Sequence, residues 1–263
     1  MPLKTFLLLA FGSVAFSQTP ILHPPVFSAN QDFFFTESVR TKTTTKASGT
    51  GVTFSFPPPS VSDLTGDLSH RVHVIIVNAV GFPTQFAVTY TAKAPDGVTT
   101  SKSGPLGRLF VVDSAKQEPQ VSVRDGKPIT PSDRTFVTDN ARRLLSYLAA
   151  IKDVSALKVM SGDRVDLPAN LVNKLLDIHD QIRGATMKLS GKEPTLSFDV
   201  QVVSIKPGDD DVVMTGLLNV APDWSSMTGS FSTKSSKEVS LDSAKIRIDA
   251  ETSLELSRTI GQP

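Results

Sequence analysis

Residues 245–258, KIRIDAETSLELSR, alternate in character from one side chain to the next. A period of two is that of a β-strand, whose successive side chains point to opposite faces of a sheet. One row consists of charged and serine side chains, so that face is expected to meet water, as is common in antiparallel sheets. The strand exceeds the usual length of about 5–6 residues, so we expect it to curve. The other row is predicted to face the core: Ile246, Ile248, Ala250, Thr252, Leu254 and Leu256.

The same alternation predicts strands on both sides of the middle of the chain. Thr41 to Thr45 is a β-branched, lysine-bearing run, which is typical of an edge strand. The prolines at 57–59 are expected to end the preceding strand, because proline donates no ladder hydrogen bond. Further strands are expected at residues 33–40, 52–56, 70–79, 86–92, 109–112, 120–123, 196–202, 212–220 and 227–231.

The period changes to three and four residues in the middle of the chain, which predicts two amphipathic helices. The first is expected to begin at a cap on Thr138 or Asp139, and the second to run from Ala169 to about Arg183, with Gly184 as its stop. Their apolar stripes need a partner, and the apolar face of a curved sheet is available. We therefore expect an α+β fold, mostly antiparallel β, with a curved sheet or half-barrel and two central helices.

Residues 1–17 have the pattern of a secretory signal peptide. A single lysine precedes an apolar run of eleven residues, Phe6 to Phe16, which is too short to anchor the chain in a bilayer. Small residues at the end of this run predict cleavage between Ser17 and Gln18. No later stretch approaches the ~20 apolar residues of a membrane span, so none is expected in the mature chain.

The rest of the chain is expected to form one unit. Residues 18–30 form a proline-rich lead-in, and residues 31–260 a single β-rich domain. Within this domain the strands are expected in 31–130 and 186–258, and the helical middle in 138–183. The formal net charge of +1 argues against nucleic-acid binding, which favours a basic excess. An exported chain without cysteine fits the bacterial periplasm or exterior, so we expect a secreted or periplasmic protein.

Three segments carry a family resemblance: Leu109–Val112, Val121–Lys127 with its Asp-Gly turn, and residues 161–168, SGDRVDLP, before a leucine-rich helix. They resemble a group of uncharacterised secreted bacterial proteins in which a β-rich half, a short helical middle and a second β-rich half follow a signal peptide. The overall plan is also similar to periplasmic lipoprotein-carrier-like folds, in which a curved antiparallel sheet wraps around helices. The resemblance implies an exported envelope protein and supplies no catalytic motif.

The residues themselves point to no catalytic group, metal site or cofactor. His70 and His73 are three apart on a predicted strand, so they leave opposite faces and cannot share a metal ion. Asp209 to Asp211 fits a solvated turn better than a calcium loop, which has a different ligand spacing. No nucleophile elbow, phosphate loop or dinucleotide motif is present. An exported hydrolase with carboxylates assembled in space stays open as the alternative function.

The aromatic residues favour apolar contacts, because 15 phenylalanines stand against two tyrosines and one tryptophan. We expect a non-catalytic binding or scaffold domain whose partner is an apolar small molecule or an envelope protein. Trp224 is interpreted as a loop anchor, with ligand stacking as its alternative. A structural or adhesive component with exposed edge strands is a third possibility. An acyl chain, or else a dry core, would be lined by Phe54, Phe56, Phe86, Leu145, Leu148 and Phe198.

Overall fold

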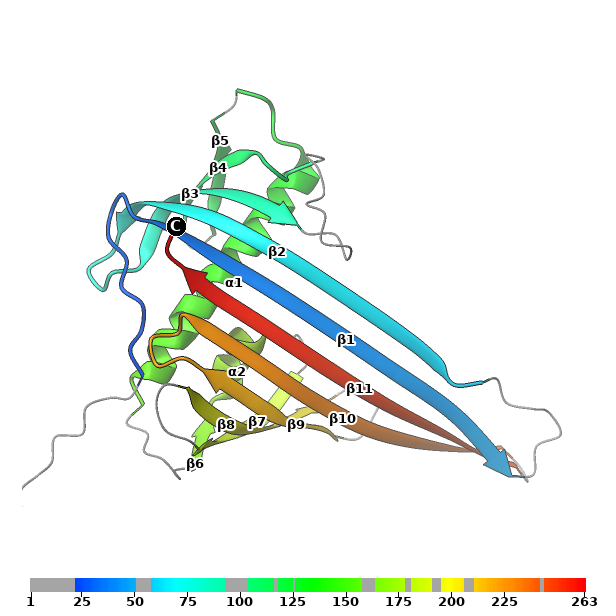
Figure 1. Ribbon diagram of the computed structural model, residues 1–263. Coiled ribbons are helices and arrows are strands. Elements are labelled where there is room, and N and C mark those ends of the chain that lie inside the picture. Colours follow the sequence, from blue (N-terminus) through cyan, green and yellow to red (C-terminus); the bar gives the residue numbers. More distant parts are fainter. Residues whose placement is uncertain are drawn as a thin grey trace, which may run out of the picture.

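The structure is a computed structural model whose described residues form eleven strands and two helices around one hydrophobic core (Figure 1). The predicted signal peptide and its predicted cleavage site lie outside the described residues, as do Phe54 and Phe56. The structure describes residues 22–50, 58–92, 104–115, 118–124, 126–157, 164–177, 181–190, 195–205, 211–241 and 244–263.

All strands join one antiparallel sheet, in the order β5-β4-β3-β2-β1-β11-β10-β9-β8-β7-β6. The first and last strands therefore pair in the middle. The first helix follows one edge strand, β5, and precedes the other, β6, and the second helix lies between β6 and β7 in the chain. The bounds are β1 Asp32–Thr50, β2 Ser60–Val77, β3 Pro83–Ala92, β4 Leu109–Asp113, β5 Gln120–Val123, α1 Pro131–Ser155, β6 Arg164–Leu167, α2 Ala169–Leu176, β7 Gln181–Ser190, β8 Leu196–Ile205, β9 Asp211–Val220, β10 Ser226–Leu241 and β11 Ala244–Gly261.

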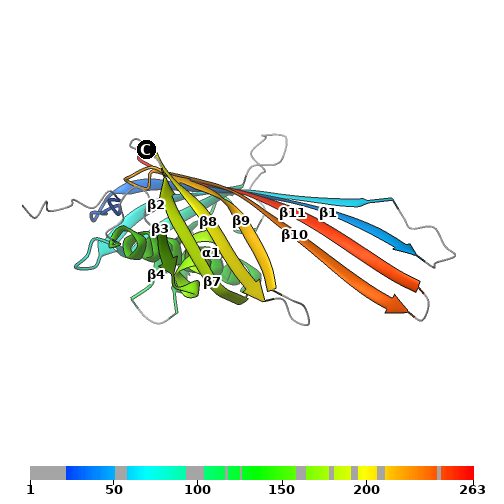
Figure 2. The same ribbon diagram turned by 90° about the horizontal axis from the view of Figure 1, so that it is seen from below.

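The sheet curves around α1, and both helices lie on its concave side (Figures 1 and 2). The edge strands β5 and β6 are not paired with each other among the described strands, so the sheet is unclosed. This confirms the prediction of a mostly antiparallel, curved sheet with two helices. The core-facing row of β8, predicted from its alternation, is buried throughout: Leu196, Phe198, Val200 and Val202.

Both helix boundaries differ from the sequence prediction. Helix α1 begins at Pro131 rather than near Thr138, because Thr130 is its cap: the Thr130 side chain accepts a hydrogen bond from the Asp133 backbone N–H. Helix α2 ends at Leu176 rather than near Arg183. Asp177 takes the left-handed conformation, with φ of 54°, and stops the helix without a glycine.

The stretch Thr41–Thr45 is not an edge strand, because it lies in β1 between β2 and β11. Its lysine, Lys42, lies on the same face as the acidic residues of β11, and the next lysine, Lys46, is directly opposite Asp249. The opposite charges of Lys46 and Asp249 stabilise the pairing of the two strands. The partner strand is more than 200 residues away in the sequence, so local pattern could not reveal it.

Four long strands run well past the helices and form a bare projection (Figures 1 and 2). We call this projection the four-stranded extension; it comprises residues 40–50 of β1, 60–67 of β2, 232–241 of β10 and 244–254 of β11. Directly opposite residues share a face, so the register divides its side chains into two sets. The inner face continues the helix-covered face, and the outer face is its opposite.

The two faces of the four-stranded extension differ in charge. Lys237 is the single charged side chain of the inner face among the residues described. The outer face carries both basic and acidic side chains, such as Lys46 and Asp249. Ile248 points inward as predicted, but it is 38% exposed rather than buried, because the helices end before reaching it. The inner face carries Thr41, Thr43, Thr45, Ala47, Ser62, Leu64, Thr233, Lys237, Val239, Ile246, Ile248, Ala250, Thr252 and Leu254.

The lead-in and the β9–β10 turn both pack onto the core. Leu22 and Phe27 are buried, and the rings of Phe27 and Phe33 lie 4.6 Å apart. The Trp224 side chain is buried and its Nε1 donates to the Ser155 hydroxyl at the end of α1, at 2.8 Å. This contact supports the interpretation of Trp224 as a loop anchor.

Candidate functional site: a buried ion network beneath the helices

A carboxylate and a guanidinium meet on the concave face of the two central strands. Glu37 of β1 and Arg258 of β11 are directly opposite each other, and Arg258 Nε donates to Glu37 Oε2 at 2.6 Å. Their side chains are 6% and 1% exposed, respectively. Charges so deeply buried persist only when they are paired and hydrogen-bonded.

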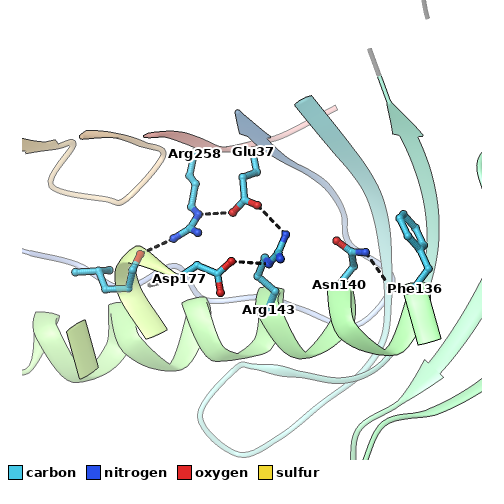
Figure 3. A network of polar contacts seen from close by, with 7 residues as sticks. Glu37, Phe136, Asn140, Arg143, Asp177 and Arg258 are labelled. Carbon is cyan, nitrogen blue, oxygen red and sulfur yellow. Dashed lines mark hydrogen bonds and ion pairs between the residues drawn. The ribbon is translucent and has the colours of Figure 1, made fainter. Parts of the chain in front are cut away.

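Both helices complete this network (Figure 3). Arg143 of α1 reaches Glu37 Oε1 through Nη1 at 3.2 Å and Asp177 Oδ2 through Nε at 2.8 Å. Arg258 Nη1 donates to the backbone carbonyl of Leu175, in the last turn of α2. The network therefore joins β1, β11, α1 and the C-terminal end of α2, and its charges alternate from Arg258 to Asp177.

A tyrosine closes the network on the side of α1. The Arg258 guanidinium lies 4.8 Å from the centroid of the Tyr147 ring, which is a cation–π distance. The Tyr147 hydroxyl contacts the Met227 sulfur at 3.7 Å. Burial, opposed by the charge of Arg258, raises the pKa of Tyr147. The phenol therefore stays neutral and packs as an aromatic ring with one weak polar contact.

His70 is buried on the same concave face, between the rings of Phe35 and Tyr90. Its Nδ1 atom has no hydrogen-bond partner among the described residues. Desolvation, followed by the charge of Arg143, lowers the pKa of His70 to about 3. The imidazole is thus a neutral member of the core at neutral pH.

Acidification from pH 7 to pH 5 should destabilise the protein by about 2 kcal/mol through His70. Between its unfolded pKa of 6.5 and its folded pKa of about 3, the unfolded chain binds a proton that the folded chain does not. The free energy of unfolding therefore falls as pH falls through this window. Urea unfolding at both pH values measures the loss, and the His70→Phe variant should lack most of it. The same pH dependence in both proteins would contradict this assignment.

The structure brings together four of the six predicted lining residues. Phe86, Leu148 and Phe198 are buried members of the core, and Leu145 packs partly buried against it. Their neighbours in this core are side chains of the sheet and helices, so these residues contribute to the packing of α1 on the sheet.

Two surface hollows lie on the face opposite the helices. One, of about 330 Å³, is lined mainly by polar residues of the central strands, including Ser38, Arg40 and Glu255. The other, of about 600 Å³, lies over β7, β8 and β9 beside Arg164 and Lys188. Neither includes any of the predicted lining residues.

Sequence reasoning missed the ion network, although its pattern contained a signal. Glu37 follows Phe33 and Phe35 in the core-facing row of β1, and Arg258 follows Leu254 and Leu256 in that of β11. A charged residue in an apolar row indicates either the end of the core or a buried partner. That these two rows face each other follows from the β1–β11 pairing, which the sequence does not reveal.

Hydrogen bonds shift the pKa of a few described carboxylates. Three of them have a clear pKa shift, and all three are lowered, whereas a general acid needs a raised value. The causes are hydrogen bonds, from His73 to Asp32, from Ser225 to Asp223 and from Arg247 to Asp249. The part of the chain that the structure describes brings no three metal-binding side chains together. Neither described helix is long and apolar enough to cross a membrane.

Comparison with known proteins identifies no relative: no family model matches the chain, and no curated protein matches it.

Proposed function

We propose that this chain is an exported, non-catalytic binding protein of the bacterial envelope that takes an apolar, acyl-type ligand on the inner face of its sheet. In this proposal the helix-covered part is a half-barrel that serves as the scaffold. The inner face of the four-stranded extension is the part available to the ligand. Export is taken from the signal-peptide pattern of residues 1–17.

The observation that carries the proposal is the continuity of this inner face. It begins among buried residues under the helices and continues outward along the same strands with Leu254, Ile248 and Ile246. On β2 it includes Leu64, which is 70% exposed. Large apolar side chains gathered on one exposed face are a recurrent mark of binding surfaces. An acyl chain could lie against these apolar side chains without covering the charged side chains of the outer face.

The ion network supports this division of roles. A buried ion pair adds little net stability, because desolvation offsets much of its attraction, but it fixes the relative position of the groups it joins. Here it holds both helices against β1 and β11. The helices therefore stay fixed over one part of the sheet, and the inner face of the four-stranded extension remains uncovered by them.

The test is binding of a fluorescent fatty acid to the whole protein. We expect saturable binding, and Ile248→Glu should weaken it at least tenfold by placing a charge on the inner face. The matched control is Ser232→Glu, which puts the same charge on the outer face of β10 and should leave the affinity unchanged. Both positions are exposed, so both variants should remain folded. Equal weakening, or no binding at high micromolar probe, would overturn the proposal.

A further inference from the structure

Among the residues described, one lateral edge of the four-stranded extension is an unpaired strand edge. Strand β3 pairs with β2 from Leu68 onward, and no described strand pairs with the outer side of β2 from Ser60 to Asp67. These eight residues run along the border of the sheet, where alternate backbone N–H and C=O groups point away from β1 (Figure 1). Such an edge is a ready template for a further strand.

The two edges of the extension differ in their protection. The β10 edge carries two lysines, Lys234 and Lys237, and lysine in particular discourages edge-to-edge pairing. The β2 edge, SVSDLTGD, has no lysine, arginine or proline. Its register with β1 is regular throughout, so it has no bulge there either. The edge along residues 60–67 is therefore left suitable for pairing.

The charges of this edge select what can pair with it. Asp63 and Asp67 lie four residues apart on the outer face, opposite Lys42 and Ser38 of β1. The Oδ1 atom of Asp67 has no hydrogen-bond partner among the described residues. On the inner face the same stretch carries Ser62, Leu64 and Gly66, which would meet small or apolar side chains.

We propose that this edge binds an extended segment of another protein by adding it as an antiparallel strand. Because opposite residues share a face, the segment should carry two basic side chains four residues apart, opposite Asp67 and Asp63. The residues on either side of each basic side chain point to the inner face and should be apolar. The charges that select the partner lie on the outer face, whereas the acyl surface is on the inner face, and the two adjoin at Leu64.

A second copy of this chain does not fit the edge in the register centred on Thr65. Pairing two β2 strands antiparallel about Thr65 places Asp63 of each copy opposite Asp67 of the other, and two like-charged pairs then repel. The β10 edge does not fit in the register that places Lys234 opposite Asp67. Glu238 follows Lys234 four residues later on the outer face, so it then lies opposite Asp63.

The test uses a blocked seven-residue peptide, Lys-Val-Thr-Val-Lys-Val-Thr, which spans Asp67 to Val61 and stops short of the part of β2 that pairs with β3, and its counterpart with both lysines replaced by glutamate. We expect the lysine peptide to bind the whole protein and to protect the amides of residues 60–67 from hydrogen exchange. The glutamate peptide should bind at least tenfold more weakly. Equal binding of the two peptides, no binding of either at millimolar peptide, or protection at another strand would overturn the inference.

Charge reversal distinguishes recognition from misfolding. The variant Asp63→Lys/Asp67→Lys should lose affinity for the lysine peptide and gain it for the glutamate peptide, which an unfolded protein would not do. Asp63→Lys alone should give an intermediate result. Glu238→Lys, a matched reversal on the opposite edge, should change neither affinity. Dimerisation of the unmodified protein with protection of residues 60–67 would overturn the inference in favour of a second copy. Fatty-acid binding should be the same in all these variants, so failure of either proposal is seen separately.

Discussion

Replacing Glu37 by leucine should destabilise the protein by about 3–5 kcal/mol, because it leaves the Arg258 guanidinium buried without its carboxylate. Arg258 is 1% exposed, and its remaining contacts are the Leu175 carbonyl and the face of Tyr147. Neither contact neutralises its charge. Arg143 also loses one partner but keeps Asp177, so most of the loss should arise at Arg258. Urea unfolding at neutral pH measures the effect.

The double variant Glu37→Leu/Arg258→Met is the control. It removes both charges together, so much of the stability lost in Glu37→Leu should return, since apolar replacements of buried ion pairs are often neutral or better. Full recovery is not expected, because the Leu175 carbonyl loses its donor. The two groups are not coupled if the free energy of unfolding lost in the double variant equals the sum of the losses in Glu37→Leu and Arg258→Met. A loss below about 0.5 kcal/mol in Glu37→Leu would lead to the same conclusion.

Period-two patterns were informative because they report how each side chain is oriented. In β8 and β11 the predicted rows lie on the predicted faces. The same pattern does not report what covers a face. Ile248 and Leu256 occupy one row of β11, yet Leu256 is buried and Ile248 is exposed, since the helices reach only the C-terminal part of that row. Coverage depends on where α1 lies, and this follows from packing between distant segments.

Local signals explain the errors at the helix ends. Thr130 is the cap of α1 and Pro131 begins its first turn. The prediction placed the start of the helix later because it relied on the apolar stripe, which begins after this turn. Asp177 ends α2 in the left-handed conformation, which glycine adopts more readily. The prediction therefore placed the end of this helix at the next glycine, Gly184, seven residues too late. Whether a strand lies at the edge or in the centre of the sheet cannot be decided from such local signals. It depends on the pairing of β1 with β11, which joins the two ends of the chain.

The ion network could not be assembled from the sequence for the same reason. Its four charged residues come from β1, α1, the end of α2 and β11, and each is unremarkable in its local context except for the two that interrupt apolar rows. Arg142 and Arg143 are adjacent on α1, yet Arg143 reaches the buried carboxylate while Arg142 pairs with exposed acidic groups. Which of the two faces the sheet is decided by how α1 docks.

Two neighbouring strands of the sheet, β9 and β10, approach each other closely at one glycine. Gly216 of β9 is directly opposite Phe231 of β10, and the Phe231 ring lies over Gly216 and Gly229 on the concave face. A Cβ atom at Gly216 would come within 2.1 Å of the Ser230 backbone oxygen and 2.7 Å of the Phe231 Cα. These are backbone atoms, so a side-chain rotation cannot relieve the contact. Strand β10 therefore leans over β9 at a point where only glycine fits.

Gly216→Ala should accordingly destabilise the protein by more than about 3 kcal/mol, because the two strands must separate to admit one methyl group. Gly184→Ala is the matched control. It also adds a methyl group to a strand of the same sheet, β7, but nothing lies within 4 Å of its Cβ position. That variant should be neutral or more stable by up to about 1 kcal/mol, since alanine loses less chain entropy than glycine on folding. Urea unfolding of both variants compares them, and similar destabilisation in the two would mean that the close approach of β9 and β10 does not constrain the sheet.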